Sequence, residues 1–193
     1  MKRRGSDEVQ VFRKRLRRRE IHLGIRYLTC SCYKRLPLLG NPSIRDEFVD
    51  VLIAARRRHG FRLIAWVVMP EHFHLLIVPT AGLGTGSDVP AILIGIKKTL
   101  AARVLRRWCE ASWSGLAGIT AADGTARFWQ AGGGFDRNVR DEFELERTIE
   151  YIHHNPVERG LVRSSLDWRW SSARWYAGVR ENTPEIDSIE GRE

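Results

Sequence analysis

Residues 61–79, FRLIAWVVMPEHFHLLIVP, form the stretch that decides the fold of this 193-residue chain. Its two halves, 61–69 and 72–78, are rich in β-branched, aromatic and other apolar residues, as strands are. Pro70-Glu71 interrupts the apolar run between them. Because two sequential strands joined by a short break most simply pair with each other, the stretch predicts a β-hairpin.

The second half of this hairpin carries two histidines, His72 and His74, on either side of Phe73. Residues i and i+2 of a strand point to the same face, so the two imidazoles should lie side by side, with Phe73 buried on the opposite face. Two neighbouring neutral imidazoles make half of a divalent-metal site. The alternative is a pair of polar residues on the wet face of a sheet.

Alternating strand and helix patterns surround this hairpin. We predict a strand at 25–33, a helix at 44–58, strands at 61–69 and 72–78, a helix at 89–108, a short strand at 126–130, a turn at 131–138 and a helix from 141 to about 154. Ser43 is the expected N-cap of the first helix, and Asp141, with Glu144 at the capping-box position, that of the last. The last helix should end before Asn155-Pro156.

This order of elements predicts an α+β fold. The first six elements match the ferredoxin-like (RRM-like) arrangement, an antiparallel sheet with both helices on one face, and a further C-terminal helix bears a tyrosine. In that arrangement the strand with His72 and His74 is interior. We expect the other, helix-free face of the sheet to be open, with the two histidines exposed on it.

The helix that begins after Asp141 keeps one tyrosine away from its apolar side. At 100° per residue, Leu145, Ile149 and Ile152 form one stripe, and Tyr151 lies roughly 130° from its middle. Asn155 follows Tyr151 by four residues and is therefore its neighbour on the helix surface. An amphipathic surface tyrosine would produce the same pattern, so the helix alone leaves both readings open.

The two histidines, Tyr151 and Asn155 could together form a reaction centre for phosphodiester cleavage. Such a reaction needs a nucleophile, a means of spreading charge on the phosphoryl oxygens, and in-line positioning. A divalent metal held by His72, His74 and the amide oxygen of Asn155 would supply the second requirement. The Tyr151 phenolate would supply the first.

Charge indicates the partner. The formal net charge is +9, of which the arm at 1–20 holds +6 and the tail at 181–193 holds −4, leaving +7 on the single domain expected at 21–180. A basic body favours a polyanion, nucleic acid first and an anionic membrane surface second. The helix at 89–108 contributes a basic side with Lys97, Lys98 and Arg103, either as phosphate contacts or as a solvated face. We expect the acidic tail to be disordered.

The remaining composition indicates a cytoplasmic protein. The three cysteines, Cys30, Cys32 and Cys109, cannot all pair within one chain, so we expect them to be reduced. No apolar run reaches the roughly 18 residues of a membrane-spanning helix. The basic N-terminus lacks the apolar stretch of a secretory signal.

Four segments, in order, resemble one known family, the single-tyrosine HUH transposases, and most of all the REP-associated tyrosine transposases. They are WVVMPEHFHLLIVP (66–79), FWQAGGGFDRNVRDE (128–142), EYIHHNPVERGLV (150–162) and DWRWSS (167–172). The resemblance covers about residues 25–176. Each motif alone is weak, but the four together, with the tyrosine helix after the histidine strand, are specific.

The resemblance implies a metal-dependent endonuclease and strand transferase that acts on single-stranded DNA near hairpins. Tyr151 would be the nucleophile and form a 5′-phosphotyrosine link, while His72, His74 and Asn155 would bind Mg²⁺ or Mn²⁺. Arg137 either contacts the DNA, as we favour, or is only a turn residue, and Arg147, on the same flank of its helix as Tyr151, is a further expected DNA contact. The implied partner is single-stranded or hairpin DNA, with no membrane, and the protein would act as a monomer or homodimer in a bacterial-type, nucleoid-associated setting.

Two other functions compete with this one. A non-catalytic RRM-like nucleic-acid-binding protein has the same fold, but it needs stacking aromatics where this chain has histidines. A hydrolase without a tyrosine intermediate would be favoured by a third histidine at alternate spacing, but residue 76 is Leu. Stacking aromatics are not absent from the chain: Trp168, Trp170 and Trp175 either stack on unpaired bases or, as we favour, pack in the core.

Overall fold

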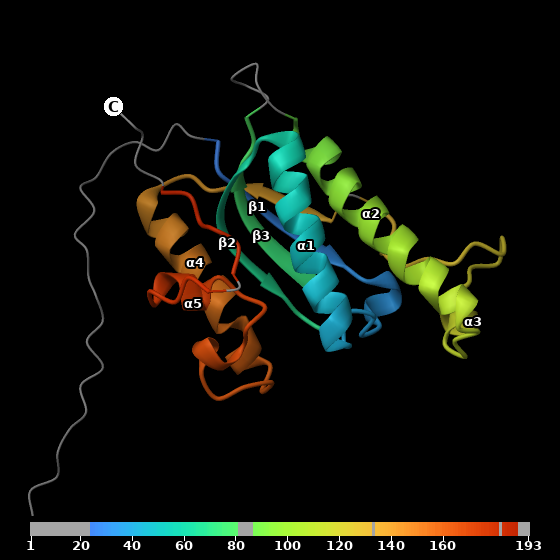
Figure 1. Cartoon of the computed structure of the whole chain (residues 1–193). Coiled ribbons are helices and arrows are strands. Elements are labelled where there is room, and N and C mark those ends of the chain that lie inside the picture. Colours follow the sequence, from blue (N-terminus) through green and yellow to red (C-terminus); the bar gives the residue numbers. More distant parts are fainter. Residues whose placement is uncertain (1–23, 81–86, 133, 182, 189–193) are drawn as a thin grey trace, which may run out of the picture.

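A four-stranded antiparallel sheet forms the centre of the molecule. The computed structural model describes residues 24–80, 87–132, 134–181 and 183–188. The strands are β1 (Arg26–Ser31), β2 (Arg62–Val68), β3 (His72–Val78) and β4 (Phe135–Asn138), and their order across the sheet is β2-β3-β1-β4 (Figure 1). The α+β class, the antiparallel sheet and the β2–β3 hairpin are as the sequence predicts.

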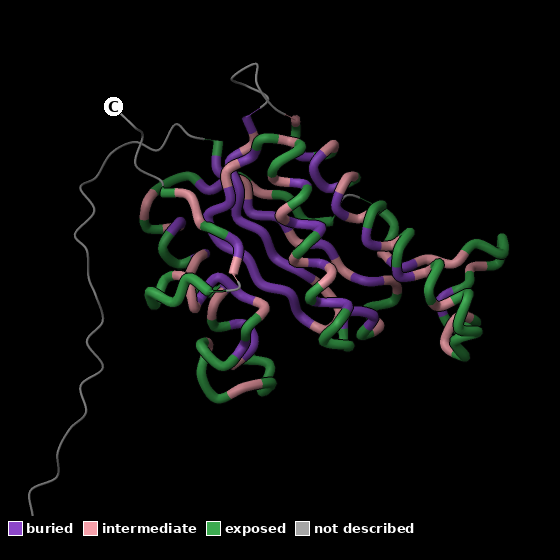
Figure 2. Tube along the Cα trace, viewed as in Figure 1, coloured by how far each residue is buried: buried purple, intermediate pink, exposed green. Residues whose placement is uncertain are grey.

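Helices α1 (Pro42–His59) and α2 (Val89–Glu110) lie side by side over one face of this sheet (Figure 1). Their apolar stripes meet the strand residues that alternate toward them, and the strands appear as a nearly continuous buried layer in Figure 2. Phe73 belongs to this core, with its ring centroid 4.8 Å from that of Phe48 on α1. Its burial opposite the two histidines is the expected result of strand alternation.

The start of α1 differs from the prediction. Asn41, not Ser43, is the N-cap, and its Oδ1 accepts a hydrogen bond from the Ser43 backbone N–H at 2.9 Å. Pro42 occupies the first helical position, where its fixed φ is favourable and its missing N–H costs nothing. Ser43 therefore lies inside the first turn.

The fourth strand also differs. It is Phe135–Asn138, in the segment that the sequence assigns to a turn, whereas 126–130 forms only isolated bridges such as Cys32 with Trp129. The cause is that β4 has no alternating apolar pattern: it is an exposed edge strand paired with β1 and held by the ion pair between Arg26 and Asp136. The aromatic pair of 126–130, Phe128 and Trp129, packs against the core instead.

The opposite face of the sheet is covered, not open. Helix α4 (Glu142–Glu158) lies over it, and its residues Leu145 and Ile152 share a second core with Val67 and Leu76 of the sheet. The prediction of an open face with two exposed histidines is therefore wrong. An amphipathic helix must bury its apolar stripe against some other surface, and this sheet face was the remaining apolar one.

Helix α4 begins as predicted and ends later than predicted. The Asp141 Oδ1 accepts a hydrogen bond from the Glu144 backbone N–H at 2.8 Å, which confirms the N-cap. The helix then runs through Asn155 and Pro156 to Glu158. Proline disfavours helical backbone in the residue before it, but both residues are buried against the rest of the protein, and this packing offsets the local cost.

The remaining segments are short. They are the helices α3 (Leu116–Ile119) and α5 (Ala173–Tyr176) and the 3-10 turns η1 (Tyr33–Arg35) and η3 (Ser165–Asp167). None of the described helices combines the length and the apolar composition needed to cross a membrane.

Part of the acidic tail has a defined place. The sequence predicts disorder from 181 onward, whereas 183–188 lies along the edge of β2. Asp187 accepts a hydrogen bond from the Leu63 N–H at 2.7 Å and pairs with Arg56 at 2.8 Å. These bonds occupy an otherwise unpaired strand edge. The predicted basic arm at 1–20 lies outside the described residues.

Candidate active site

His72 and His74 project from β3 into the space between the sheet and α4. Their Nε2 atoms are 3.0 Å apart and their ring centroids 4.6 Å apart. His74 is only 3% exposed, so the pair lies under the helix and not on a wet surface. The sequence thus predicts the side-by-side arrangement of the two imidazoles, but not their burial.

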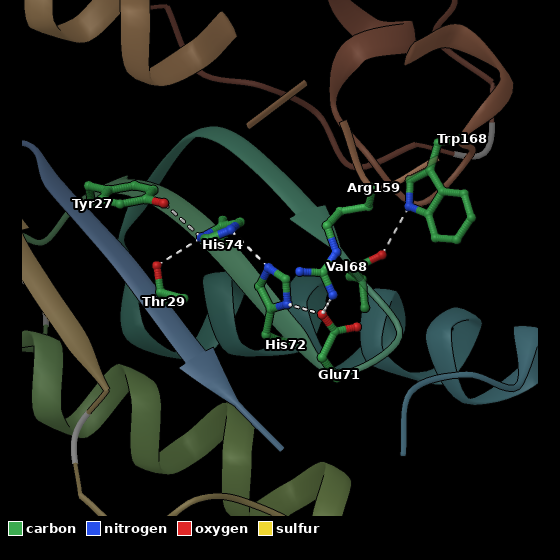
Figure 3. Close-up of polar contacts among 8 residues, drawn as sticks. All are labelled: Tyr27, Thr29, Val68, Glu71, His72, His74, Arg159 and Trp168. Atoms are coloured by element: carbon green, nitrogen blue, oxygen red, sulfur yellow. Dashed lines mark hydrogen bonds and ion pairs between the residues drawn. The ribbon is translucent and has the colours of Figure 1, made fainter. Parts of the chain in front are cut away.

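The inner histidine, His74, is held by two hydroxyls of β1. Its Nδ1 lies 2.8 Å from the Tyr27 Oη and 2.8 Å from the Thr29 Oγ1 (Figure 3). The strand register explains the contact: Thr29 is directly opposite His74, and Tyr27 lies two residues away on the same face. The hydroxyls leave the Nε2 of His74 facing His72.

The outer histidine, His72, is held by a carboxylate. Its Nδ1 lies 3.2 Å from the Oε1 of Glu71, and the same oxygen lies 2.6 Å from Nη2 of Arg159 (Figure 3). Both imidazoles are therefore fixed through Nδ1, and both Nε2 atoms point to one place. This is the geometry in which imidazoles bind a metal through Nε2, with a second set of partners orienting the rings.

Burial keeps both imidazoles neutral. Burial, together with the neighbouring His72, lowers the pKa of His74 to about 3. Burial also lowers the pKa of His72, although the nearby Glu71 opposes this change. Neutral imidazoles keep the lone pair that a metal ion requires. Burial raises the pKa of Tyr27 to about 12, so this phenol stays protonated beside His74.

Tyr151 lies beside this histidine pair. Its ring centroid is 5.5 Å from that of His74 and 6.4 Å from that of Tyr27. The side chain is 43% exposed, as expected from its position away from the apolar stripe of α4. A phenol that is both accessible from outside and next to the imidazoles can reach a bound phosphate near them.

Asn155 lies one helical turn after Tyr151, and Arg159 one turn after Asn155. Because Tyr151 contacts His74 and Arg159 contacts Glu71, this row of α4 runs along the histidine segment of β3, with Asn155 between its two ends. Asn155 is only 4% exposed, and its Oδ1 has no hydrogen-bond partner. Such an oxygen is costly to bury unless something else binds it.

These donors fit a divalent metal ion. Two Nε2 lone pairs and one buried amide oxygen without a partner make a mixed nitrogen and oxygen set. Among the described residues, no group of three or more His, Cys, Asp or Glu side chains is arranged to hold a metal, so the third ligand would be the amide.

The arginines predicted to bind DNA lie next to Tyr151. Arg137 and Arg147 line a hollow of about 540 Å³ together with Tyr151. The exposed aromatics Phe135 and Phe143 line the same hollow. Arg137 also forms an ion pair with Glu144 at the start of α4, whereas the Arg147 guanidinium lies over the Phe143 ring.

The predicted lysines line a different hollow, of about 470 Å³, along α2. Lys97 and Lys98 line it together with Asp136, and the Lys97 Nζ donates to the Gly132 carbonyl at 3.1 Å. The β4 segment thus borders both hollows, since Asp136 faces one and Arg137 the other. Arg103 is exposed on α2 and lines neither hollow among those described.

The tryptophans are mostly structural. Trp168 is buried and its Nε1 donates to the Val68 carbonyl at 3.0 Å. Trp170 packs beside it, with the Arg45 guanidinium 3.9 Å from the centre of its ring. Trp175 is half-buried and carries the Arg180 guanidinium over its ring.

Known proteins resemble this chain along most of its length. No family model matches. A Haemophilus influenzae protein assigned to the REP-associated tyrosine transposases is 28% identical over 66% of this chain and 67% of its own length. The REP-associated tyrosine transposase of Escherichia coli is 26% identical over 63% of this chain and 59% of its own length. The predicted resemblance to the REP-associated tyrosine transposases is confirmed.

A solved structure of a REP-associated tyrosine transposase bound to a REP hairpin has the same fold. Its TM-score with this chain is 0.60 at 23% sequence identity, and the match covers 92% of this chain and 93% of that chain.

Four side chains of this site were not predicted: Tyr27, Thr29, Glu71 and Arg159. The resemblance to the REP-associated tyrosine transposases did not indicate them, because it was carried by the histidine and tyrosine motifs. Tyr27 and Thr29 have the i, i+2 spacing of one strand face, but only the register of β1 against β3 places them at His74. Glu71 is adjacent to His72 in the sequence, and Arg159 follows Asn155 by four residues; these spacings were the available signals.

Proposed function

We propose that this protein is a metal-dependent single-stranded DNA endonuclease and strand transferase that acts near hairpins through a 5′-phosphotyrosine intermediate. The observation that carries the proposal is the position of Tyr151. Its side chain is accessible from outside, and its ring centroid lies 5.5 Å from that of His74, whose Nε2 atom faces the Nε2 atom of His72. The similarity to REP-associated tyrosine transposases supports it, as does the shared fold of the protein bound to a REP hairpin.

In this proposal His72, His74 and Asn155 would hold Mg²⁺ or Mn²⁺. When bound, the ion would stabilise the charge that develops on the phosphoryl oxygens. The protein's own part is to exclude water, since α4 covers the pair, and to keep both imidazoles neutral.

Tyr151 would carry out the covalent step. Its Oη would attack the scissile phosphorus and lose its proton, and the bond from phosphorus to the 3′ oxygen would break. The leaving strand would depart as a 3′-OH after taking up a proton, and the other strand would remain attached to Tyr151 through its 5′ phosphate. Attack by a 3′-OH on this link reverses the step, so rejoining needs no added energy source.

Arg137 and Arg147 would hold the DNA backbone at the hollow beside Tyr151, and Lys97, Lys98 and Arg103 would extend the contact along α2. We further infer that the sheet is ferredoxin-like, because its order β2-β3-β1-β4 and the two helices on one face agree with that arrangement. The helix with the tyrosine would then be an addition on the other face.

One observation favours a second function, a non-catalytic nucleic-acid-binding protein. Phe135, Phe143 and Tyr151 are exposed around the hollow that Arg137 and Arg147 line, as in surfaces that stack on unpaired bases. Base stacking of this kind does not require two converging imidazoles beneath the surface.

The double substitution His72→Ala with His74→Ala separates the two functions. Cleavage of a hairpin-containing single-stranded oligonucleotide in Mn²⁺ should disappear, while binding in a mobility-shift assay should persist, since the basic hollows are unchanged. Undiminished cleavage by this variant would show that His72 and His74 do not bind a metal needed for cleavage. Absence of cleavage by the native protein would favour the binding function.

A further inference from the structure

We propose that Glu71 is a positioning residue, which fixes the His72 imidazole with its Nε2 lone pair directed at the metal and fastens the end of α4 to the same point. The proposal rests on the proposed function, because it assigns a purpose to a metal site. Neither the sequence motifs nor the similarity to other proteins assigns a role to this carboxylate.

Glu71 is held firmly in the turn between β2 and β3. Its carbonyl accepts a hydrogen bond from the Cys32 N–H at 2.8 Å, which fixes the turn to the end of β1. Its side chain is 12% exposed, and Oε1 has two partners, His72 at 3.2 Å and Arg159 at 2.6 Å (Figure 3). The first residue of β3 and the C-cap residue of α4 therefore meet at one carboxylate oxygen, on a turn that is itself bonded to the end of β1.

The chemistry of a carboxylate determines which nitrogen of His72 carries the proton. An ionised carboxylate only accepts hydrogen bonds. The contact with Glu71 thus requires a proton on Nδ1 of His72, and a neutral imidazole then has its lone pair on Nε2. Without a metal, the Nε2 atoms of His72 and His74 are 3.0 Å apart and need one proton between them, which must then belong to His74.

His74 has partners of a different kind. Its Nδ1 faces the hydroxyls of Tyr27 and Thr29, and a hydroxyl can donate or accept. For Nε2 of His74 to serve as a metal ligand, its proton would have to lie on Nδ1, and the two hydroxyls could then accept a hydrogen bond from Nδ1 instead of donating one. His72 needs no such change, because Glu71 already holds it in the metal-binding tautomer.

Arg159 extends the effect of Glu71 to the catalytic helix. Its backbone N–H donates to the Asn155 carbonyl at 3.1 Å, at the end of α4, while its guanidinium binds Glu71. The carboxylate therefore fastens the end of the helix that carries Tyr151 and Asn155 beside the strand that carries His72. Second partners of this kind typically change metal affinity 10–100-fold when they are removed.

The test uses the full-length, metal-free protein. Long-range ¹H–¹⁵N NMR spectra, with His72 assigned through a His72→Gln variant, report which ring nitrogen is protonated, and titration with Mn²⁺ followed by electron paramagnetic resonance gives the affinity. We expect His72 of the native protein to be protonated at Nδ1. Glu71→Ala should give a mixture of tautomers and bind Mn²⁺ about 10–100-fold more weakly. Glu71→Gln, which keeps an acceptor oxygen, should preserve the tautomer and most of the affinity.

Glu47→Ala is the matched control, because Glu47 is a part-buried acid paired with Arg107 at 2.8 Å on the opposite side of the sheet. It should change neither readout. The proposal is overturned if native His72 is protonated at Nε2. This measurement is made on the native protein and does not depend on the folding of any variant. The proposal is also overturned if folded Glu71→Ala keeps both the native tautomer and the native Mn²⁺ affinity. Suppose that Glu71→Ala changes both the His72 tautomer and the Mn²⁺ affinity, but the native protein forms no covalent adduct with DNA. This result would support the role of Glu71 and contradict the proposed function.

Discussion

The ring of Tyr151 lies 5.5 Å from the ring of His74, centroid to centroid, although the two residues belong to different elements on different layers of the molecule. The contact depends on α4 packing its apolar stripe on the face of the sheet where the histidines point. The same packing buries the imidazoles and leaves the phenol accessible. The proposed nucleophile and the proposed metal half-site are thus brought together by one packing interaction.

Asn155 provides the most local test of the metal site. Its buried Oδ1 has no hydrogen-bond partner, so Asn155→Ala removes the proposed metal ligand without breaking any bond described for that oxygen. We expect Mn²⁺ affinity, measured by calorimetry, to fall at least about tenfold. Asn155→Asp, which keeps an oxygen, should retain binding. If Asn155→Ala binds Mn²⁺ as tightly as the native protein and unfolds at the same temperature, Asn155 is not a ligand.

Arg147 should contribute to DNA binding through phosphate contact. It lines the hollow with Tyr151 and, unlike Arg137, has no described carboxylate partner of its own. Arg147→Ala should weaken binding of hairpin DNA and reduce the slope of log affinity against log salt by about 1. Arg57→Ala is the control, since Arg57 is exposed on α1, which packs on the face of the sheet opposite to α4. An equal change in the slope of log affinity against log salt in both variants would contradict the proposal that DNA binds at the hollow beside Tyr151.

Stability should fall in acid because of His153. This imidazole lies 2.8 Å from Ser172 Oγ, and burial lowers its pKa to about 4, against about 6.5 in the unfolded chain. The unfolded state therefore binds more protons between these values, so stability is complete above pH 6.5 and declines as pH falls toward 4. His153→Gln should reduce the loss between pH 7 and pH 5 by about 2 kcal/mol. Urea unfolding at both pH values measures this loss, and an unchanged loss would contradict the assignment.

Gly134 allows β4 to approach β1. Its φ is +83°, and a Cβ there would lie 2.2 Å from the Thr29 carbonyl oxygen. Gly134→Ala must push β4 outward and should lower the free energy of unfolding by roughly 2–4 kcal/mol. Gly132→Ala is the control, because its φ is +94° but nothing lies within 4 Å of the added Cβ, so we expect a loss of about 1 kcal/mol. Equal losses would show that backbone strain alone, and not the close approach, matters.

The features that the sequence predicts correctly are those that depend on local periodicity. Alternation within β3 places His72 and His74 on one face and Phe73 on the other. Helical periodicity likewise separates Tyr151 from the buried stripe of α4. Each of these features follows from the geometry of a single element.

The features that could not be predicted depend on how elements pack or on strands without a pattern. The Glu71–Arg159 contact joins residues 88 positions apart, and the contact of Tyr27 with His74 follows from the register of two strands. The covered face depends on the docking of α4. The edge strand β4 has exposed, mixed residues, so hydrophobic alternation cannot reveal it.

The central claim is that Tyr151 attacks DNA, and trapping the covalent product tests it most directly. Native protein incubated with a hairpin-containing single-stranded oligonucleotide and Mn²⁺ should give a protein–DNA adduct that migrates slowly on a denaturing gel. Peptide mapping of that adduct should find the nucleotide on Tyr151, and Tyr151→Phe, which removes only the hydroxyl, should form none. A Tyr151→Phe protein that forms the adduct as well as the native protein does would contradict the account.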